Sequence, residues 1–304
     1  MTGITAEKTE NHTLRAYLLL TVTTWCWGAN AIFGKVAVGE ISPMLLVTLR
    51  WLGVVILLLL FARKYLVQDW PILRHHLVYV GLMGGIGLTA FNALFYIAAY
   101  STSAINIGII QGSIPVFVLL GSYLIFKNHV TKIQTCGVAV TLVGVFTVAS
   151  GGNFMGLAGL SVNQGDLLML LACFLYAGYS LGLSRGPKVS ALGLFTLLAG
   201  AAFLVSLPLL SYEILADEFK APTTTGWVVV ALVTLLPSFV AQIFFIQSIS
   251  LIGPGRAGVF VNLVPVFASI MAVYYLQESF EPFHAVSLGL VLGGIWLSEM
   301  GKLK

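Results

Sequence analysis

Amide, hydroxyl and aromatic side chains occur inside segments that are otherwise almost entirely apolar. Several recur at three- or four-residue spacing, which places them on one face of a helix. Trp27 and Asn30 have this spacing in one segment, and Asn92 and Tyr96 have it in another. A polar side chain in such a segment is costly to expose to lipid, so it faces a cavity or another helix. The candidate binding residues of this kind are Trp27, Asn30, Asn92, Tyr96, Gln111, Tyr176, Tyr179, Ser180, Gln242 and Asn262.

These side chains would together form an uncharged lining of aromatic rings, amides and hydroxyls. Such a lining suits a small amphipathic solute whose apolar body carries a few hydrogen-bonding groups. The alternative role of each residue is a hydrogen bond between helices, worth roughly 0.6–2 kcal/mol. The cysteines Cys26, Cys136 and Cys173 are far apart and form no metal-binding or disulfide pattern, so we expect no metal and no cofactor.

Arg50 is the one charge well inside an apolar segment, and Glu278 lies near the end of another. Arg50 lies about 7 residues, or roughly 10 Å, from the start of its helix. We expect a structural role for both charges. The arginine would extend to the polar end of its segment or pair with Glu278 or Glu40, and a substrate carboxylate is the alternative partner.

Pro115 and Pro265 lie in the middle of two apolar segments, 150 residues apart. Each proline removes a backbone hydrogen bond and kinks its helix. We expect the pair to act as hinges or gates, and a fixed bend in each helix is the alternative.

One segment resembles a catalytic motif. Gly178–Gly182 fits the pattern GxSxG around Ser180, but that pattern normally lies on a turn between a strand and a helix. A serine nucleophile also needs a base within hydrogen-bond reach, and the histidines lie in connectors or tails. We therefore expect no enzyme, with an intramembrane serine hydrolase using Ser180 as a remote alternative.

The amino-acid composition indicates the class of protein to which this chain belongs. Of 304 residues, 59% are hydrophobic and only 9% are charged, whereas a soluble domain carries about 25% charged residues. This excludes a soluble enzyme, a disordered chain and a nucleic-acid binder. The net charge of +4 comes from single residues scattered between apolar runs. The remaining class is an all-α polytopic membrane protein.

Ten segments reach the roughly 20 apolar residues that a helix needs to cross a bilayer. Residues 1–14 form a polar tail that precedes them, and the connectors between the segments are short. The predicted spans are residues 15–36, 43–63, 77–99, 103–126, 131–150, 165–184, 190–212, 225–250, 255–277 and 283–300.

Positive charges gather on one side of these spans. Apart from Arg50, all of the 15 Lys and Arg residues except Lys35 and Lys220 fall on that side. Cytoplasmic connectors are enriched in Lys and Arg. We therefore expect that side, which includes both termini, to be cytoplasmic, and two termini on one side require an even number of spans.

The second half of the chain repeats the first at an offset of 150 residues without a gap. Gly108–Phe117 matches Gly258–Phe267, with the glycine and a Pro-Val-Phe sequence shared. Each repeat, residues 15–150 and 165–300, holds five spans, and an odd number inverts the second copy in the membrane. Inverted-topology repeats are a recurrent feature of secondary transporters, with the substrate site between them. A duplication kept only for packing is the alternative.

With these motifs the chain resembles the drug/metabolite transporter superfamily, in its ten-helix EamA-type branch. The resemblance covers about residues 15–300, with one departure, since the counterpart of Glu278 in the first repeat is Asn128. In layout the chain is most similar to the YddG-type exporters of aromatic and other amino acids. The segments that carry the resemblance are Trp27–Asn30, Thr48–Trp51, Phe91–Tyr96, the regions of Pro115 and Pro265, and Glu278.

The resemblance implies a multi-pass protein of the bacterial inner membrane that exports amino acids, especially aromatic or apolar ones, and similar small metabolites by alternating access. Transport would be secondary-active or facilitative. Export of drugs or other metabolites and a lipid flippase are the alternatives. The expected partners are a small-molecule substrate and the lipid bilayer, without nucleic acid. The oligomeric state, a monomer included, and proton coupling stay open.

Overall fold

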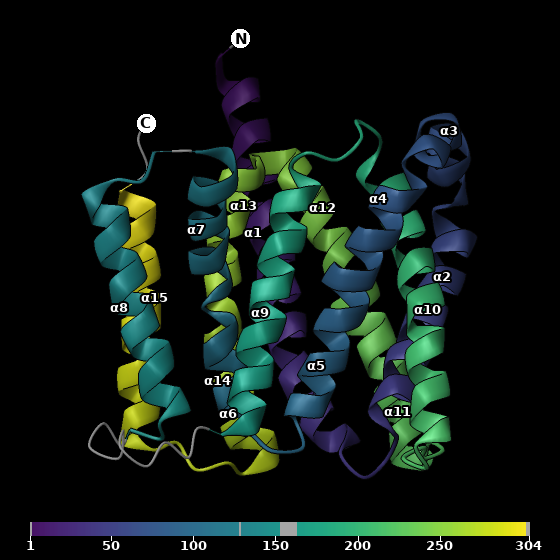
Figure 1. Ribbon diagram of the computed structural model, residues 1–304. Coiled ribbons are helices and arrows are strands. Elements are labelled where there is room, and N and C mark those ends of the chain that lie inside the picture. The colour runs from purple at the N-terminus through teal and green to yellow at the C-terminus, as the bar shows by residue number, and fades with distance from the viewer. Residues whose placement is uncertain (1, 128, 153–162, 302–304) are drawn as a thin grey trace.

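The computed structural model describes residues 2–127, 129–152 and 163–301, and the regular structure in these ranges is entirely helical. Three residues used in the sequence analysis, Asn128, Lys302 and Lys304, lie outside the described residues. Ten helical segments of the described chain are long and apolar enough to cross a membrane. They stand side by side in one bundle (Figure 1). The predicted all-helical fold with ten spans is thereby confirmed.

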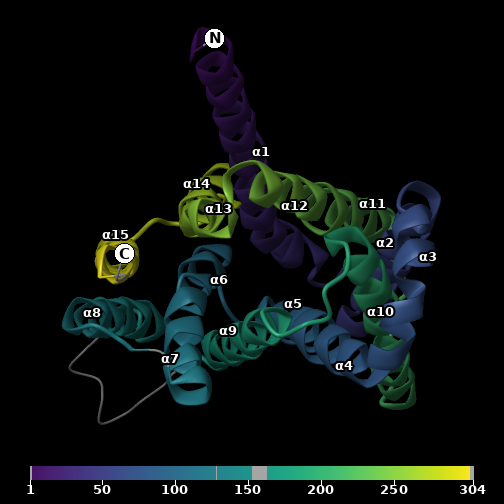
Figure 2. The same ribbon diagram turned by 90° about the horizontal axis from the view of Figure 1, so that it is seen from above.

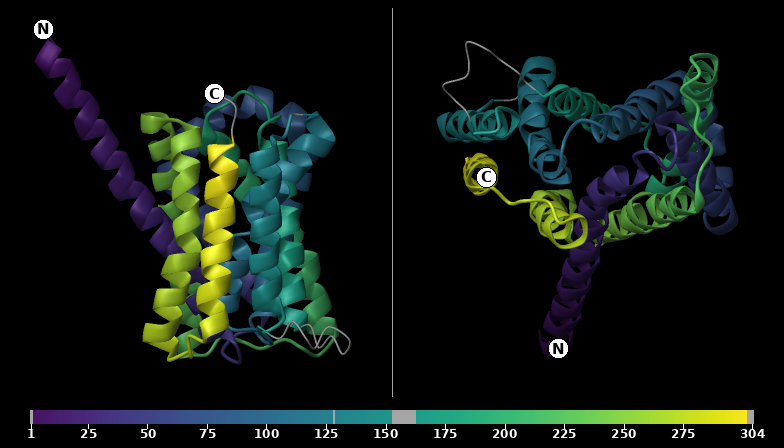
Figure 3. Two further views of the ribbon diagram at one scale, coloured as in Figure 1. Left: turned by 90° about the vertical axis from the view of Figure 1, so that its left-hand side faces the viewer. Right: turned by 90° about the horizontal axis from the view of Figure 1, so that it is seen from below.

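Six spans are uninterrupted helices. They are α1 (Thr2–Ala37), α2 (Pro43–Phe61), α8 (Lys132–Ala149), α9 (Gln164–Leu183), α10 (Ala191–Leu215) and α15 (Pro282–Met300). α1 begins within the tail expected over residues 1–14, and its first turns project from the bundle (Figure 3).

The other four spans are each divided into shorter pieces. The third joins α3 (Arg63–Leu73), a 3-10 turn (Arg74–His76), α4 (Leu77–Leu82), the π-helix η2 (Met83–Ala90) and α5 (Phe91–Ala98). The fourth joins α6 (Ala104–Gln111) and α7 (Ile114–Phe126). The eighth joins α11 (Thr224–Val233), the π-helix η4 (Thr234–Val240) and α12 (Ala241–Ile252). The ninth joins α13 (Pro254–Phe260), the 3-10 turn η5 (Val261–Leu263) and α14 (Val264–Leu276).

The interruptions recur at the 150-residue offset found in the sequence. The π-helix η4 covers the positions that match all of η2 except its first residue. The break between α6 and α7 corresponds to η5, and Pro115 and Pro265 lie in the first turn after each break. α7 and α14 also end alike, in the left-handed residues Lys127 (φ 56°) and Gln277 (φ 55°).

Two expectations about the elements are corrected. The connector expected over residues 64–76 is helical, because Arg63–Leu73 continues α2 as the separate helix α3. The spans expected as single helices over 77–99, 103–126, 225–250 and 255–277 are interrupted. Proline without a backbone N–H accounts for the breaks before Pro115 and Pro265 and for a lost donor at Pro237 inside η4.

Side-chain caps fix several helix starts at the ends of the bundle. Ser103 and Ser190 accept hydrogen bonds from backbone N–H groups in the first turns of α6 and α10. Thr131 and Gln134 form a reciprocal capping box at the start of α8. These caps bond N–H groups that have no partner within the helix. The capping residues lie in the short connectors, so they fix where these helices begin.

The helix packing follows the repeat. α1 packs on α12 and α14, while α9, the counterpart of α1, packs on α5 and α7, the counterparts of α12 and α14. α2 packs on α10, and α8 packs on α15, and each of these pairs joins matching helices of the two halves. Seen from above, α8 and α15 form one end of the bundle, and α2, α3 and α10 form the other (Figure 2).

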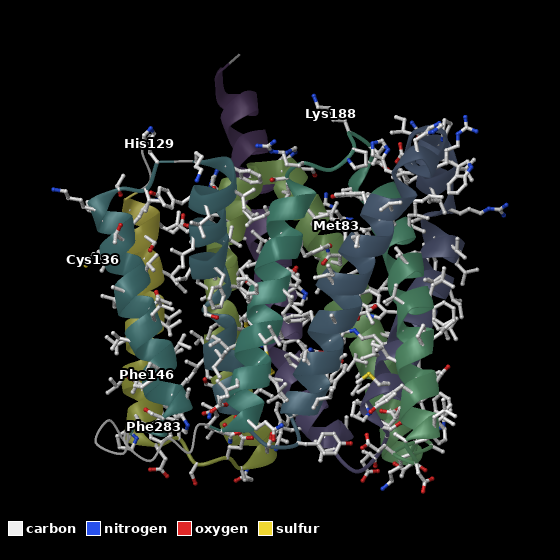
Figure 4. All side chains as sticks on the ribbon, viewed as in Figure 1. Met83, His129, Cys136, Phe146, Lys188 and Phe283 are labelled. Carbon is white, nitrogen blue, oxygen red and sulfur yellow. The ribbon has the colours of Figure 1, made fainter. Side chains whose placement is uncertain are left out.

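We call the face at which α1 begins and α15 ends the upper face, as in Figure 1, and the opposite face the lower face. His129 and Lys188 lie at the upper face, and Phe283 lies at the lower face (Figure 4). Fully buried apolar side chains toward the lower face include Ile41, Phe95, Ile105 and Ile109.

Candidate functional site

A central pocket lies between the two halves of the chain. Its empty volume is about 830 Å³, including space open to solvent, and its walls come from α1, α2, α9, α10 and all four interrupted spans. Each interruption contributes directly: Leu88 from η2, Ile114 after the break in the fourth span, Ser238 from η4 and Val261 from η5. Irregular backbone is tolerated at membrane depth only where protein buries it or a cavity adjoins it, so the interruptions mark this pocket as a site.

Arg50 is the charged group of the pocket. Its side chain is 6% exposed and reaches three other helices rather than an end of the bundle. Nε donates to Ser238 Oγ (2.6 Å), and Nη1 donates to Tyr96 OH (2.5 Å) and Asn30 Oδ1 (3.1 Å). Ser238 Oγ donates in turn to the carbonyl of Val233 (2.6 Å), five residues back along η4.

The structure corrects the expected partners of Arg50. The guanidinium neither extends to the end of its helix nor contacts Glu40 or Glu278. No carboxylate of the described residues bonds to it. Glu278 instead lies at the lower face and accepts hydrogen bonds from Ala104 N (2.8 Å) and Ile105 N (3.0 Å), so it caps α6.

Aromatic rings and amides complete the pocket. Trp27 donates from Nε1 to the carbonyl of Pro237 (3.1 Å), and its ring lies 5.1 Å from that of Phe245. Tyr176 packs on Phe91 with ring centroids 4.9 Å apart. The surface available to a solute therefore combines aromatic rings and aliphatic side chains with several polar groups.

A second pocket continues from the first toward the upper face. Its empty volume is about 1270 Å³, and it shares Trp27, Ile114, Tyr176 and Val261 with the central pocket. It extends to Ser298 near the end of α15. The two pockets form one path from the centre of the bundle to the upper face.

Polar contacts join the helices at the lower face. Thr102 Oγ1 and Asn106 Nδ2 both donate to the buried carboxylate of Asp166 in the first turn of α9. Lys35 Nζ donates to the carbonyl of Ala99 (2.8 Å). The pocket at this face, near Lys35 and Asp166, shares no lining residue with the central pocket. The conformation is therefore open upward and closed downward.

Eight of the ten candidate binding residues line one or both of the connected pockets, and Tyr96 and Tyr179 do not. Tyr96 instead holds Arg50, and Tyr179 packs against Tyr176, 5.4 Å between ring centroids. Pro115 lines the second pocket and Pro265 the central one. The eight are Trp27, Asn30, Asn92, Gln111, Tyr176 and Gln242 in the central pocket, with Ser180 and Asn262 in the second.

Ser180 has no catalytic geometry. Its hydroxyl donates to the carbonyl of Tyr176 (2.9 Å), one turn earlier in the same helix. No histidine of the described residues is a hydrogen-bond partner of this hydroxyl. The GxSxG match therefore belongs to the lining of the second pocket.

Trp51 and Phe195 are among the lining residues that the sequence did not predict. Trp51 follows Arg50 directly, and neighbouring residues on a helix point in different directions, yet both line the pocket. Phe195 comes from α10, whose apolar sequence gives no sign of which side faces inward. Only the positions of the neighbouring helices identify these two side chains.

The family model that matches the chain describes the same pair of halves. The model of the EamA-like transporter family matches residues 14–150 and again residues 163–300. The chain belongs to the EamA-like transporter family. The resemblance to the drug/metabolite transporter superfamily is thereby confirmed.

Relatives of this EamA-like protein agree with the assignment. The uncharacterized transporter YetK of Bacillus subtilis is 25% identical over 295 residues, covering 94% of this chain and 87% of the relative. The uncharacterized inner membrane transporter YedA of Escherichia coli is 24% identical over 286 residues, covering 91% and 88%. A solved crystal structure matches with a TM-score of 0.61 and 19% identity over 95% of this chain and 96% of the other, which supports the fold. The protein is a multi-pass transporter of the inner membrane.

Proposed function

We propose that this transporter exports amino acids with aromatic or apolar side chains by alternating access. The observation that supports it is the central pocket, whose lining combines aromatic and aliphatic side chains with amide, hydroxyl and guanidinium groups. An aromatic amino acid has one large apolar body and a small polar end, so both kinds of surface find a counterpart in one site.

The proposed site excludes some rival solutes on physical grounds. Arg50 is the one cationic side chain lining the central pocket. A sugar phosphate with two negative charges would need more than one cation and few aromatic rings. A lipid flippase would need a lateral path to the bilayer, whereas the path described here runs from the centre to the upper face.

Alternating access is supported by the relation between the two halves. The contacts of α1 with α12 and α14 have counterparts in the other half at the 150-residue offset, namely those of α9 with α5 and α7. The four interrupted spans also form two matching pairs at this offset. α1 starts and α9 ends at the upper face (Figure 1), which is the relation expected of an inverted repeat. Exchanging the conformations of the halves would close the upper path and open a lower one.

The orientation proposed from the positive charges makes the upper face cytoplasmic. Lys188 lies at that face (Figure 4), while Lys220 lies in the connector after α10 at the lower face. The described conformation is then open to the cytoplasm, where an exporter collects its substrate.

Counterflow into proteoliposomes tests the proposal. Vesicles that contain the purified protein are loaded with unlabelled Trp, Phe, Thr or a sugar phosphate, and labelled uptake is followed with and without a pH gradient. We expect a saturable overshoot for Trp and Phe that empty vesicles lack. Overshoot only with the sugar phosphate, or none with any amino acid, would contradict the substrate class. The pH comparison distinguishes proton coupling from facilitated transport.

A further inference from the structure

Arg50 carries a buried charge that no described acidic residue balances. All three groups bonded to its guanidinium, on Asn30, Tyr96 and Ser238, are neutral. A cation in the interior of a membrane protein is costly, and such residues normally pair with an anion or mark the path of a substrate. Because Arg50 lines the central pocket, an anion that balances its charge would bind there.

The guanidinium has donors left for an anion. It carries five N–H groups, and its bonds to Ser238, Tyr96 and Asn30 use Nε and Nη1. In the part of the chain that the structure describes, Nη2 has no hydrogen-bond partner. A carboxylate is the group that an arginine recognises with the best geometry, through parallel N–H···O bonds.

Two further polar atoms of the same pocket are buried without a partner. Trp51 Nε1 is a donor, and Asn92 Oδ1 is an acceptor, and each residue is 3% exposed. An unmade hydrogen bond at a buried polar atom costs about 1–3 kcal/mol, so both atoms favour a ligand that supplies the bond. The indole N–H can only donate, which suits an anion beside Arg50. The amide oxygen suits an ammonium group.

The remaining bonds hold the arginine in place. Its guanidinium carbon lies 5.6 Å from the Trp51 ring centroid and 5.9 Å from that of Tyr96. Ser238, which fixes Nε, itself donates to the carbonyl of Val233 at the end of α11. A cation fixed from three helices is ready to meet an anion without reorganising.

We propose that Arg50, assisted by Trp51 Nε1, binds the carboxylate of the substrate and makes a carboxylate obligatory for recognition. This inference rests on the proposed function and narrows it: the substrate is an amino acid or another aromatic monocarboxylate, and amines that lack the carboxylate are rejected. Arg50 is then the residue that determines specificity, and Asn92 receives the ammonium group of a zwitterion.

The test is binding of four matched probes to the purified full-length protein in lipid nanodiscs, by calorimetry. L-tryptophan and indole-3-propionate carry a carboxylate, whereas tryptamine and L-tryptophanamide do not. We expect the two carboxylates to bind about tenfold to a hundredfold more tightly, the range for a hydrogen bond to a charged group. Equal affinity for tryptophan and tryptamine would overturn the inference.

Variants assign the discrimination to a residue. Arg50→Gln is expected to remove the preference for carboxylates and leave tryptamine binding unchanged, with partial recovery in Arg50→Lys. Arg256→Gln is the matched control, because this arginine is exposed and, among the described residues, its side chain bonds only to Tyr17 OH (2.7 Å). A preference for carboxylates that persists in Arg50→Gln would overturn the inference.

Trp51→Phe provides a second variant if Arg50→Gln does not fold. It removes the N–H donor together with the pyrrole ring, and we expect about threefold to tenfold weaker binding of both carboxylates relative to tryptamine. Unchanged carboxylate binding in a folded Trp51→Phe protein would contradict the role of Nε1. If the wild-type protein shows tryptophan counterflow but Arg50→Gln still selects carboxylates, only this inference fails. If no amino acid binds or moves, the proposed substrate class fails with it.

Discussion

At the scale of single residues, the central pocket contains some polar groups that are hydrogen-bonded and others that have no partner. Arg50 has bonds to three helices, whereas Asn92 Oδ1 and Trp51 Nε1 have none. Asn92 does donate through Nδ2 to the carbonyl of Leu88 (2.6 Å), which fixes its amide in direction. Asn92 Oδ1 is thus fixed in direction without a hydrogen-bond partner.

Replacing the pocket amides tests the assignment of individual residues. We expect Asn92→Leu and Gln242→Leu each to reduce counterflow of tryptophan by about fivefold to tenfold, because each removes a hydrogen bond to the solute. Gln247→Leu is the control, since Gln247 lies on the same helix as Gln242 but is exposed. Wild-type flux in both pocket variants, at equal protein levels, would disprove the lining.

The sequence predicted most of the polar part of this lining, because polar residues in apolar spans stand out by type and spacing. It could not give the partners of Arg50, because Asn30, Tyr96 and Ser238 come from three other spans. It also missed Trp51, for which periodicity predicts a different direction from that of its neighbour. Contacts between spans depend on how the helices are placed, which no single span encodes.

At the scale of elements, glycines set the closest helix contact. A Cβ on Gly294 of α15 would lie 2.6 Å from the carbonyl oxygen of Gly137 in α8 and would also meet the side chain of Thr141. A Cβ on the adjacent Gly293 would meet nothing within 4 Å. Gly294 and Gly293 therefore provide a test position and a control position in one helix.

Gly294→Ala is expected to destabilise the protein by about 1–3 kcal/mol, the cost of overpacking a close contact. Gly293→Ala should be neutral within error. Thermal unfolding in detergent measures both. An equal midpoint for the two variants would show that α8 and α15 do not approach as closely as described.

The cap on α6 links two elements across the lower face. Glu278, just after α14, accepts hydrogen bonds from the first turn of α6, where an anion is favoured at a helix N-terminus. Losing such a cap costs about 1 kcal/mol. We expect Glu278→Ala to favour opening of the lower face, with a smaller effect in Glu278→Gln, which keeps an acceptor.

The reactivity of a cysteine in the central pocket toward a thiol reagent added at the lower face measures this opening. About 1 kcal/mol corresponds to a roughly fivefold faster reaction in Glu278→Ala. An unchanged rate would mean that the cap serves only the stability of α6.

The sequence predicted ten spans because each apolar run reaches the length of a bilayer. It predicted kinks at Pro115 and Pro265 from the missing backbone donor, but not the breaks in the helix that precede both prolines. The π-helix η2 was not predicted, because the sequence Met83–Ala90 contains no proline and its glycines and apolar residues also suit an ordinary helix. A π-helix depends on packing, here against α9 and α10.

At the scale of the whole molecule, two similar halves enclose one pocket with a path to one face. The path passes Ser298 at the upper face, while Asp166 and Glu278 bind α6 at the lower face. We propose that during transport the two halves exchange conformations, which closes the upper path and opens a lower one. The interrupted spans are the points at which the helices bend. The central claim is that the same pocket opens to each face in turn.

A single cysteine in the central pocket tests that claim most directly. Leu88→Cys lies in η2 and lines only the central pocket, and the native Cys26, Cys136 and Cys173 are first replaced by alanine. A membrane-impermeant thiol reagent is added to either side of oriented vesicles, with and without L-tryptophan, and the cysteine-free protein is the control. The account predicts labelling from the upper face without substrate, labelling from the lower face when tryptophan cycles the protein, and slower labelling at saturating tryptophan. Labelling from one face alone under every condition would contradict it.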